Sequence, residues 1–361
     1  MRSLTFQMTG WERIKLLVRR IAAMVVFYSG VNALYRFLAR RNQAVVLMYH
    51  RVIDPADLQC LYLQPGMYVT REAFEMQMEY LSRRYHVITL DECIQRMKRG
   101  DRFLRNTCVI TFDDGWKDTY THAYPILKKY DLPATVFLVS DYVGTDRSFW
   151  PERVSYLLMR LFEIGEVKEY GSTIYVALEK MGFFRLVSNP VLTPTQKIEA
   201  VIERMKSLMQ ADREKALYEL EDLLKDHLEP GCSKSLILNW EEVAEMIRSN
   251  TAFGSHSKTH AILTKLSKDE ARQEIVESKQ AMESLLSKPC WAFSYPNGDY
   301  NDEIKRIIKD YYECAFTTQR GFVKHGADLF ALERIGIHND MTFTIPLFAS
   351  RISGFLSILG L

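Results

Sequence analysis

The sequence predicts an α/β barrel or near-barrel that is interrupted by a mainly helical insertion. Short apolar runs, which are typical of fully buried strands, alternate with segments of helical spacing. This strand pattern largely disappears between residues 149 and 236 and then resumes. Such alternation indicates a parallel sheet with helical crossovers. In barrels of this kind, catalytic residues lie at the carboxyl ends of the strands.

The first part of the chain supplies the opening strands of the predicted sheet. Continuous apolar runs indicate buried strands at residues 44–49, 107–112 and 134–139, with a short strand at 86–89. The spacing of apolar residues predicts helices over 71–84, 90–98 and 116–130, the last with a break at Pro125.

The middle of the chain, residues 149–236, predicts the insertion. Residues 199–227 are strongly helical by composition, and their apolar residues fall on one side. One strand is expected within the insertion, at residues 173–177.

After the insertion, the alternation of helices and strands returns. Capping-box patterns at Asn239 and Ser267 predict the starts of two helices, reaching about 248 and 286. Strands are predicted at 251–254, 291–295, 313–317 and 332–337, with a helix at 302–310.

Residues 1–43 form a separate basic and apolar segment. Residues 21–35 are mostly apolar between arginines, but a helix of that length rises only about 22 Å, short of the roughly 30 Å bilayer core. No A-x-A-like site follows, which disfavours a signal peptide. Two alternatives stay open: an interfacial helix on an anionic membrane, or a helix packed on the domain. The apolar tail 343–361 poses the same choice.

Net charge and cysteine spacing argue against a nucleic-acid-binding protein and against a disulfide-bonded secreted protein. The formal net charge is +2, and the sequence has no zinc-finger spacing, glycine-rich phosphate loop or basic run with interleaved aromatics. We therefore expect no nucleic-acid partner. The six cysteines form no C-x-x-C pair, which favours free thiols in a reducing compartment over three disulfides of a secreted protein.

Two carboxylates, Asp113 and Asp114, directly follow the predicted strand 107–112. With Gly115 they could form an ordinary turn. Adjacent carboxylates at a strand end can also point in different directions, one toward a metal ion and one toward a substrate. Such a pair is costly unless a cation offsets the repulsion.

Two histidines, His256 and His260, follow the predicted strand 251–254. At positions i and i+4 they would share a face of a helical turn and could chelate one ion, or they could be unrelated exposed imidazoles. The barrel places them on the same rim as Asp113 and Asp114. Two histidines with one carboxylate form a known catalytic zinc set that leaves a position for water.

Three further residues follow predicted strands. Asn297 lies in the segment 295–298, which reads as a tight turn when taken alone. His50 ends the first strand and His338 follows the last. Each histidine could be a proton donor or a satisfied structural residue.

These segments resemble the polysaccharide deacetylases with NodB homology. Residues 111–115 (TFDDG) match the first motif of that family and residues 256–260 (HSKTH) match its second. Residues 295–298 match part of the third motif, and 47–52 (LMYHRV) are similar to the opening strand of one subgroup. The resemblance covers about 44–141 and 238–338. It implies a distorted (β/α) barrel of the NodB-homology type over 44–342, with the helical insertion at about 149–236.

The resemblance also implies roles for single residues. Asp113 is similar to the general base, and Asp114, His256 and His260 to the ligands of a divalent metal ion. Zinc is expected, although Co²⁺, Ni²⁺ or Fe²⁺ would suit the same ligands. The Asn297 N–H is similar to an oxyanion donor. His50 is expected as general acid, with His338 as runner-up.

The sequence departs from the family pattern at two places. Ser294 stands where the family often has an arginine, so the group that orients Asp113 is not identified. Residues 335–338 match the usual leucine-rich motif around the acid histidine only loosely.

The implied function is removal of N-acetyl groups from amino sugars of a surface polysaccharide or its lipid-linked precursor. The expected location is cytoplasmic, at the inner face of the plasma membrane. One alternative is a carbohydrate O-acetyl esterase, which could use the same site. The other is an inactive carbohydrate-binding homologue, against which the intact Asp113, Asp114, His256 and His260 argue.

Overall fold

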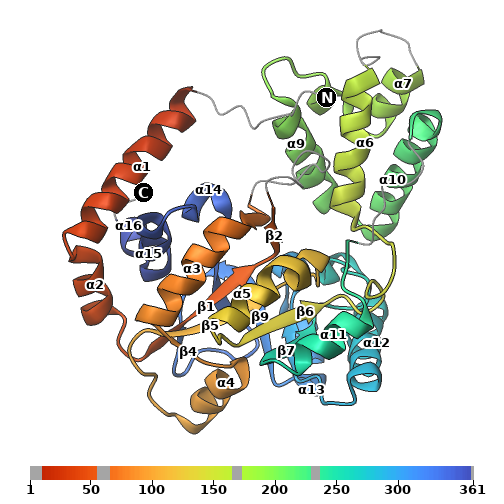
Figure 1. Cartoon of the computed structure of the whole chain (residues 1–361). Coiled ribbons are helices and arrows are strands. Elements are labelled where there is room, and N and C mark those ends of the chain that lie inside the picture. The colour runs from red at the N-terminus through yellow and green to blue at the C-terminus, as the bar shows by residue number, and fades with distance from the viewer. Residues whose placement is uncertain (1–9, 55–65, 165–172, 229–235, 359–361) are drawn as a thin grey trace.

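The computed structural model describes residues 10–54, 66–164, 173–228 and 236–358 of the chain. Figure 1 shows a barrel surrounded by helices, with α1 and α2 along one flank and α6, α7, α9 and α10 gathered on the opposite side. Within the described ranges, no helix has the length and apolarity needed to cross a bilayer.

Seven parallel strands close into the barrel. Their order is β1-β11-β9-β8-β7-β6-β5, and β5 pairs with β1 to complete the ring. Two short strands extend this sheet: β10 runs antiparallel to β1, and β4 runs parallel to β5. The strands are β1 (Gln43–Tyr49), β4 (His86–Val87), β5 (Thr107–Phe112), β6 (Ala134–Leu138), β7 (Thr251–Ser255), β8 (Ala292–Ser294), β9 (Cys314–Arg320), β10 (Val323–Lys324) and β11 (Leu332–Gly336). The predicted α/β barrel is therefore confirmed, with fewer than eight strands in the ring.

A second, two-stranded sheet of β2 (Arg51–Ile53) and β3 (Tyr68–Thr70) has no counterpart among the predicted elements. The helices around the barrel are α3 (Arg71–Arg84), α4 (Leu90–Arg99), α5 (Tyr124–Lys129), α11 (Trp240–Ile247), α12 (Lys268–Leu286) and α13 (Asp302–Tyr311). The capping boxes at Asn239 and Ser267 are both present and begin α11 and α12 as predicted.

The helix predicted over 116–130 is confirmed from Lys117 to Lys129, but the predicted break at Pro125 is wrong. A π-helical segment, Thr119–Ala123, leads into α5, and Pro125 lies in the first turn of α5 rather than at a break. Proline has no N–H to donate, and the π-helical segment that precedes it replaces the usual pairing of each N–H with the carbonyl four residues back. Trp116 instead forms an isolated antiparallel bridge with Ile237.

Alternation along the strands decides which side chains enter the barrel. On β1, Ala44 and Val46 join an apolar cluster with Phe316 and Leu332, whereas Val45 and Leu47 pack outside against the helices. Because successive strand side chains point to opposite faces, every second residue continues the inward face toward the carboxyl rim. By this count the inward positions at the rim are His50, Asp113, His256, Ser294, Arg334 and His338.

The insertion is helical over the residues that the structure describes. Its helices are α6 (Trp150–Ile164), α7 (Thr173–Lys180), α8 (Phe184–Val187), α9 (Pro194–Lys206) and α10 (Gln210–Leu224), and they enclose an apolar core of their own. The strand expected at 173–177 is wrong. Ile174 and Leu178, one helical turn apart in α7, bury their side chains in this core, and packing outweighs the β-branched composition.

The N-terminal segment packs on the barrel domain through one of its faces. Gly30, with a φ of 79°, separates α1 (Gly10–Tyr28) from α2 (Val31–Ala39). The buried Ala23 of α1 contacts Leu347 and Leu356 of the C-terminal helices. The last helices are α14 (Asn339–Thr342), α15 (Ile345–Ser353) and α16 (Phe355–Ile358).

Cys93, Cys108, Cys290 and Cys314 are free and buried. The remaining two cysteines, Cys60 and Cys232, lie outside the described residues.

Candidate functional site

Asp113 and Asp114 lie at the carboxyl end of β5, where they are almost fully buried. The backbone turns sharply here: Asp114 has a φ of 74° and Gly115 a φ of 78°. Asp is one of the few residues that tolerate this left-handed conformation. Glycine suits the second position because its φ is positive and because a Cβ on Gly115 would lie 2.6 Å from Leu138 Cδ2. The two consecutive carboxylates consequently point to different partners.

Asp114, His256 and His260 form a group that could hold a metal ion. One potential ligand atom from each residue lies within 4.8 Å of the others. The Nε2 atoms of both histidines lie 3.3 Å from Asp114 Oδ1. A buried carboxylate facing two imidazoles is the donor set that a divalent transition metal prefers. The residues present therefore fit a divalent metal ion.

Hydrogen bonds to neighbouring residues determine which atoms of His256 and Asp114 remain free to bind a metal ion. His256 Nδ1 lies 2.7 Å from the Ser294 carbonyl oxygen, to which it donates, so its Nε2 is the nitrogen left for a metal. The indole N–H of Trp116 donates to Asp114 Oδ2 at 2.8 Å, which leaves Oδ1 facing the histidines. His260 Nδ1 is buried, and no described residue hydrogen-bonds to it.

The segment that carries the two histidines is an irregular loop, so the expected helical turn is wrong. Ser257 and His260 have positive φ values of 65° and 62°. The buried Glu274 of α12 holds the loop, because it accepts hydrogen bonds from the backbone N–H groups of Lys258 and Thr259 at 3.0 and 2.8 Å. Sequence reasoning missed Glu274, which lies about two turns inside the helix that Ser267 caps.

Asp113 forms a buried ion pair with Arg334 of β11. The two guanidinium N–H groups lie 2.8 and 2.7 Å from the two carboxylate oxygens. Arg334 is fully buried, and its Nε donates to the Thr317 carbonyl oxygen at 3.1 Å. Ser294 Oγ accepts from Arg334 at 2.8 Å and donates to Asp113 at 3.3 Å. Arg334 of β11 thus provides the arginine partner of Asp113 that is absent at position 294, where this sequence has a serine.

The electrostatics keep Asp113 ionised. Burial by itself raises the pKa of this carboxyl, but the charges of Arg334, His256 and His50 and the Arg334 hydrogen bond bring it below its ordinary value. Asp113 is therefore a carboxylate at neutral pH, as a proton acceptor must be.

His50 and His338 lie on neighbouring strands at the same rim. Met48 pairs with Gly336, and the Ile337 N–H donates to the Met48 carbonyl oxygen at 2.9 Å. Each histidine lies two residues after a member of this pair, so the two are at the same level of the barrel. Burial lowers the pKa of His50, against the attraction of Asp114 and Asp113. The Nδ1 of His338 pairs with Asp340, which leaves its Nε2 available.

Asn297 lies in the turn after β8. Its φ of 59° is left-handed, and its side chain donates to Asp299 at 2.8 Å. A Cβ on the next residue, Gly298, would lie 2.1 Å from Thr318 Oγ1, so the tight turn depends on that glycine.

Both ends of the insertion meet the metal-ligand group. Phe149, which precedes α6, has its ring centroid 5.0 Å from that of His260 and 5.0 Å from that of Trp116. At the other end, Leu238 donates to the Gly115 carbonyl oxygen at 2.9 Å. The insertion is thereby attached directly beside Asp114.

The chain is similar to known proteins over much of its length. A family model described as "Polysaccharide deacetylase" matches residues 101–169 and 196–312, together more than half of the chain. "Putative polysaccharide deacetylase YxkH" of Bacillus subtilis (strain 168) is 21% identical over 299 residues, which are 82% of this chain and 72% of that protein.

Poly-beta-1,6-N-acetyl-D-glucosamine N-deacetylase of Staphylococcus epidermidis is 34% identical over 114 residues, but these are only 29% of this chain and 39% of that protein. Among solved structures, the Streptococcus pyogenes deacetylase PplD in complex with acetate has a TM-score of 0.53 at 21% identity. The likeness covers 83% of this chain and 95% of that one, and it supports the fold.

Proposed function

This chain belongs to the polysaccharide deacetylase family, and from that premise we propose that it is a metal-dependent hydrolase that removes N-acetyl groups from amino sugars. The observation that carries the proposal is that the two adjacent carboxylates have different partners. Asp114 faces His256 and His260, whereas Asp113 beside it is held ionised by Arg334.

The proposed reaction is hydrolysis of the acetyl C–N bond. Asp114, His256 and His260 would hold a divalent ion, which would polarise the acetyl carbonyl and lower the pKa of water. Asp113 accepts one proton from the attacking water, whose oxygen bonds to the acetyl carbon. The Asn297 N–H stabilises the developing oxyanion, a contribution of about 3–4 kcal/mol for a well-placed donor. Acetate and a free amino sugar result.

The leaving nitrogen needs a proton, and two histidines compete to donate it. His50 follows β1 directly beside Asp113, and we assign it the role of general acid. Burial lowers its pKa, which opposes storage of a proton at neutral pH. His338 is the runner-up, because Asp340 orients its ring and leaves Nε2 free. Single substitutions decide between them.

The proposed substrate is a surface polysaccharide or its lipid-linked precursor, and zinc is the proposed metal. We place the reaction in the cytoplasm, at the inner face of the plasma membrane. The support for this location is the basic, apolar N-terminal segment.

Metal analysis of the purified protein, combined with an acetate-release screen over N-acetylated and O-acetylated glycans, tests the proposal. We expect about one metal ion per chain and faster release from N-acetyl sugars. Preference for O-acetyl sugars would make the protein an esterase. Glycan binding by fully metallated protein, without acetate release from any sugar, would make it an inactive carbohydrate-binding homologue.

A further inference from the structure

The outer face of α1 carries a continuous row of exposed apolar side chains. Leu17, Val18, Ile21, Met24, Val25 and Tyr28 are between 44% and 77% exposed. Their spacing of three and four residues places them on one side of the helix. Leu34, Phe37 and Leu38 of α2, each about half exposed, continue the row. We call these nine residues the apolar stripe.

The opposite face of the two helices is fixed to the domain. Ser353 donates to the buried Asn32 side chain at 2.6 Å, and Arg36 donates to the hydroxyls of Tyr80 and Tyr85 at 3.1 Å each. Because these contacts occupy the inner face, α1 and α2 cannot turn the stripe inward without breaking them. Figure 1 shows both helices at the outer edge of the molecule.

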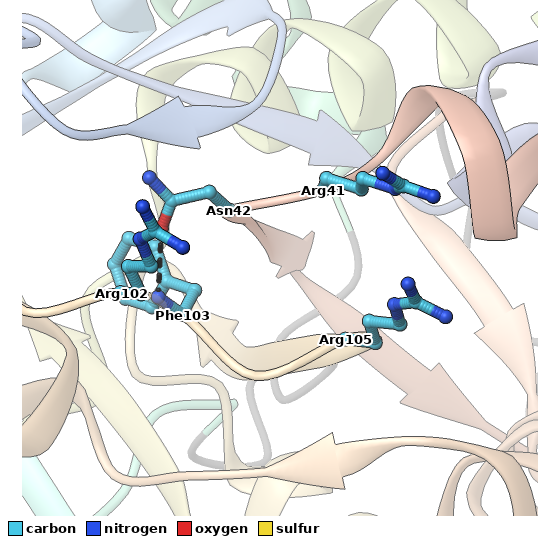
Figure 2. Close-up of a pocket in the computed structure, with 5 residues that line it drawn as sticks. All are labelled: Arg41, Asn42, Arg102, Phe103 and Arg105. Atoms are coloured by element: carbon cyan, nitrogen blue, oxygen red, sulfur yellow. Dashed lines mark hydrogen bonds between the residues drawn. The ribbon is translucent and has the colours of Figure 1, made fainter.

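A cluster of arginines lies at the end of the stripe. An open hollow of about 440 Å³ is lined by Arg41, Asn42, Arg102, Phe103 and Arg105. Figure 2 shows these five residues. The three arginines are exposed. The Phe103 N–H donates to Asn42 Oδ1 at 2.9 Å and joins the two segments that form the hollow. We call this feature the arginine hollow.

The hollow and the stripe are parts of one surface. The Arg105 guanidinium lies 3.7 Å from the ring centroid of Phe37, which belongs to the stripe. Leu104, 49% exposed, adds an apolar side chain between Phe103 and Arg105. The stripe adds no negative charge to this surface, because the sequence from Ile14 to Ile53 contains no Asp or Glu. Asp101, next to Arg102, is the carboxylate nearest to the hollow in the chain.

We propose that the apolar stripe and the arginine hollow together bind the surface of an anionic lipid bilayer. The stripe would enter the boundary between headgroups and acyl chains, and the arginines would contact lipid phosphates. A second copy of this chain is a poorer occupant. A two-fold contact through the same surface would bring arginines against arginines, and like charges across an interface are unfavourable.

The surface runs along the length of the barrel. Arg41 lies just before the start of β1 at the base, two residues ahead of Gln43, whereas Arg20 of α1 stacks on Phe343, which follows α14 at the carboxyl rim. A bilayer bound to this flank would leave the rim opening sideways, close to the headgroups. This orientation would suit the proposed reaction on a lipid-linked sugar, but lipid binding itself does not depend on deacetylase activity.

Flotation of the full-length metal-loaded protein with vesicles tests the inference. One vesicle set contains equal parts of phosphatidylcholine and phosphatidylglycerol, and the other contains phosphatidylcholine alone. We expect binding to the anionic set that weakens with added salt. Val18→Asp with Val25→Asp should lower the affinity at least tenfold, because both exposed side chains would otherwise enter the bilayer. Arg41→Ser with Arg102→Ser should lower it by about fivefold for each arginine.

Matched changes away from the surface serve as controls. Val176→Asp with Val191→Asp alters exposed valines of the insertion region, and Arg248→Ser with Lys288→Ser removes two exposed cations. Both control pairs should float like the wild type. Metal-dependent thermal stabilisation checks that every variant is folded without invoking activity. Equal flotation of the stripe variant and the wild type overturns the inference. A wild-type dimer that fails to float, and becomes monomeric in the stripe variant, assigns the surface to a second copy instead.

Discussion

Arg334 and Asp113 form a two-bond ion pair inside the barrel, although they lie 221 positions apart in the chain. The arginine comes from β11, the aspartate follows β5, and β1 lies between these two strands. The planar guanidinium fixes both carboxylate oxygens at once, which a lysine could not do. The pair therefore sets both the charge and the orientation of the proposed base.

Arg334→Met should damage both stability and turnover. It leaves the buried Asp113 carboxylate without its cation, and breaking a buried pair in this way costs about 3–5 kcal/mol. We expect that loss in the free energy of unfolding, measured by urea denaturation. Acetate release should fall by about a hundredfold, because the base loses its orientation. Arg334→Lys keeps the charge but not the two-bond geometry, and should be intermediate in both measurements. An Arg334→Met variant with wild-type stability would show that the pair is dispensable.

Substitution of the two neighbouring aspartates should have different consequences. Asp114→Ala removes a proposed ligand and should lose the metal, measured by elemental analysis of dialysed protein. Asp113→Asn is nearly isosteric and should keep the metal while turnover falls at least a hundredfold. The opposite result, with metal lost from Asp113→Asn and retained by Asp114→Ala, would reverse the two roles.

The two rim histidines should be separable by the choice of leaving group. His50→Ala should lower amide hydrolysis by about 10²–10⁴, as expected when a general acid is removed, and metal content should stay normal. The loss should shrink on an activated ester, whose leaving group needs no proton. His338→Ala and Asp340→Asn are the comparison variants. If these two are inactive while His50→Ala remains active, then His338 is the acid.

Metal binding should be visible as stabilisation without any assay of catalysis. A metal that binds only the folded state at about a hundred times its dissociation constant adds about 2.7 kcal/mol to the free energy of unfolding. We expect added Zn²⁺ to raise the melting temperature of the metal-free protein. His256→Ala with His260→Ala should abolish that rise. An undiminished rise in the double variant would mean that zinc acts elsewhere.

Sequence reasoning located those parts of the site that depend on local pattern. Asp113 and His256 each follow a predicted strand, and parallel strands bring such ends to one rim. Arg334 was not singled out, because its partner is fixed only when the barrel closes. Its signal is nevertheless present: of the two charged residues in the predicted strand 332–337, Arg334 lies two positions from Leu332 and therefore on the same face as that apolar residue.

Local patterns failed where tertiary packing decides the conformation. The segment 173–177 has β-branched residues but lies among helices with which Ile174 packs. The spacing of His256 and His260 suits a helical turn, yet Glu274 holds the backbone between them in a loop with positive φ values. Glu274 lies on a separate helix, α12, and most of the insertion core comes from α6, α9 and α10, so the contacts that decide these conformations lie largely outside the local segments.

The pairing of β5 with β1 and of β1 with β11 also has a consequence for the time at which the site forms during synthesis. The carboxylates and both histidines of the metal-ligand group leave the ribosome well before Arg334, which lies in the last strand of the barrel. A nascent chain can thus gather every proposed metal ligand while Asp113 still lacks its guanidinium. Asp113 is correctly oriented only after β11 has paired with β1 and closed the barrel. The proposed hydrolase therefore becomes active at the same step at which the barrel closes.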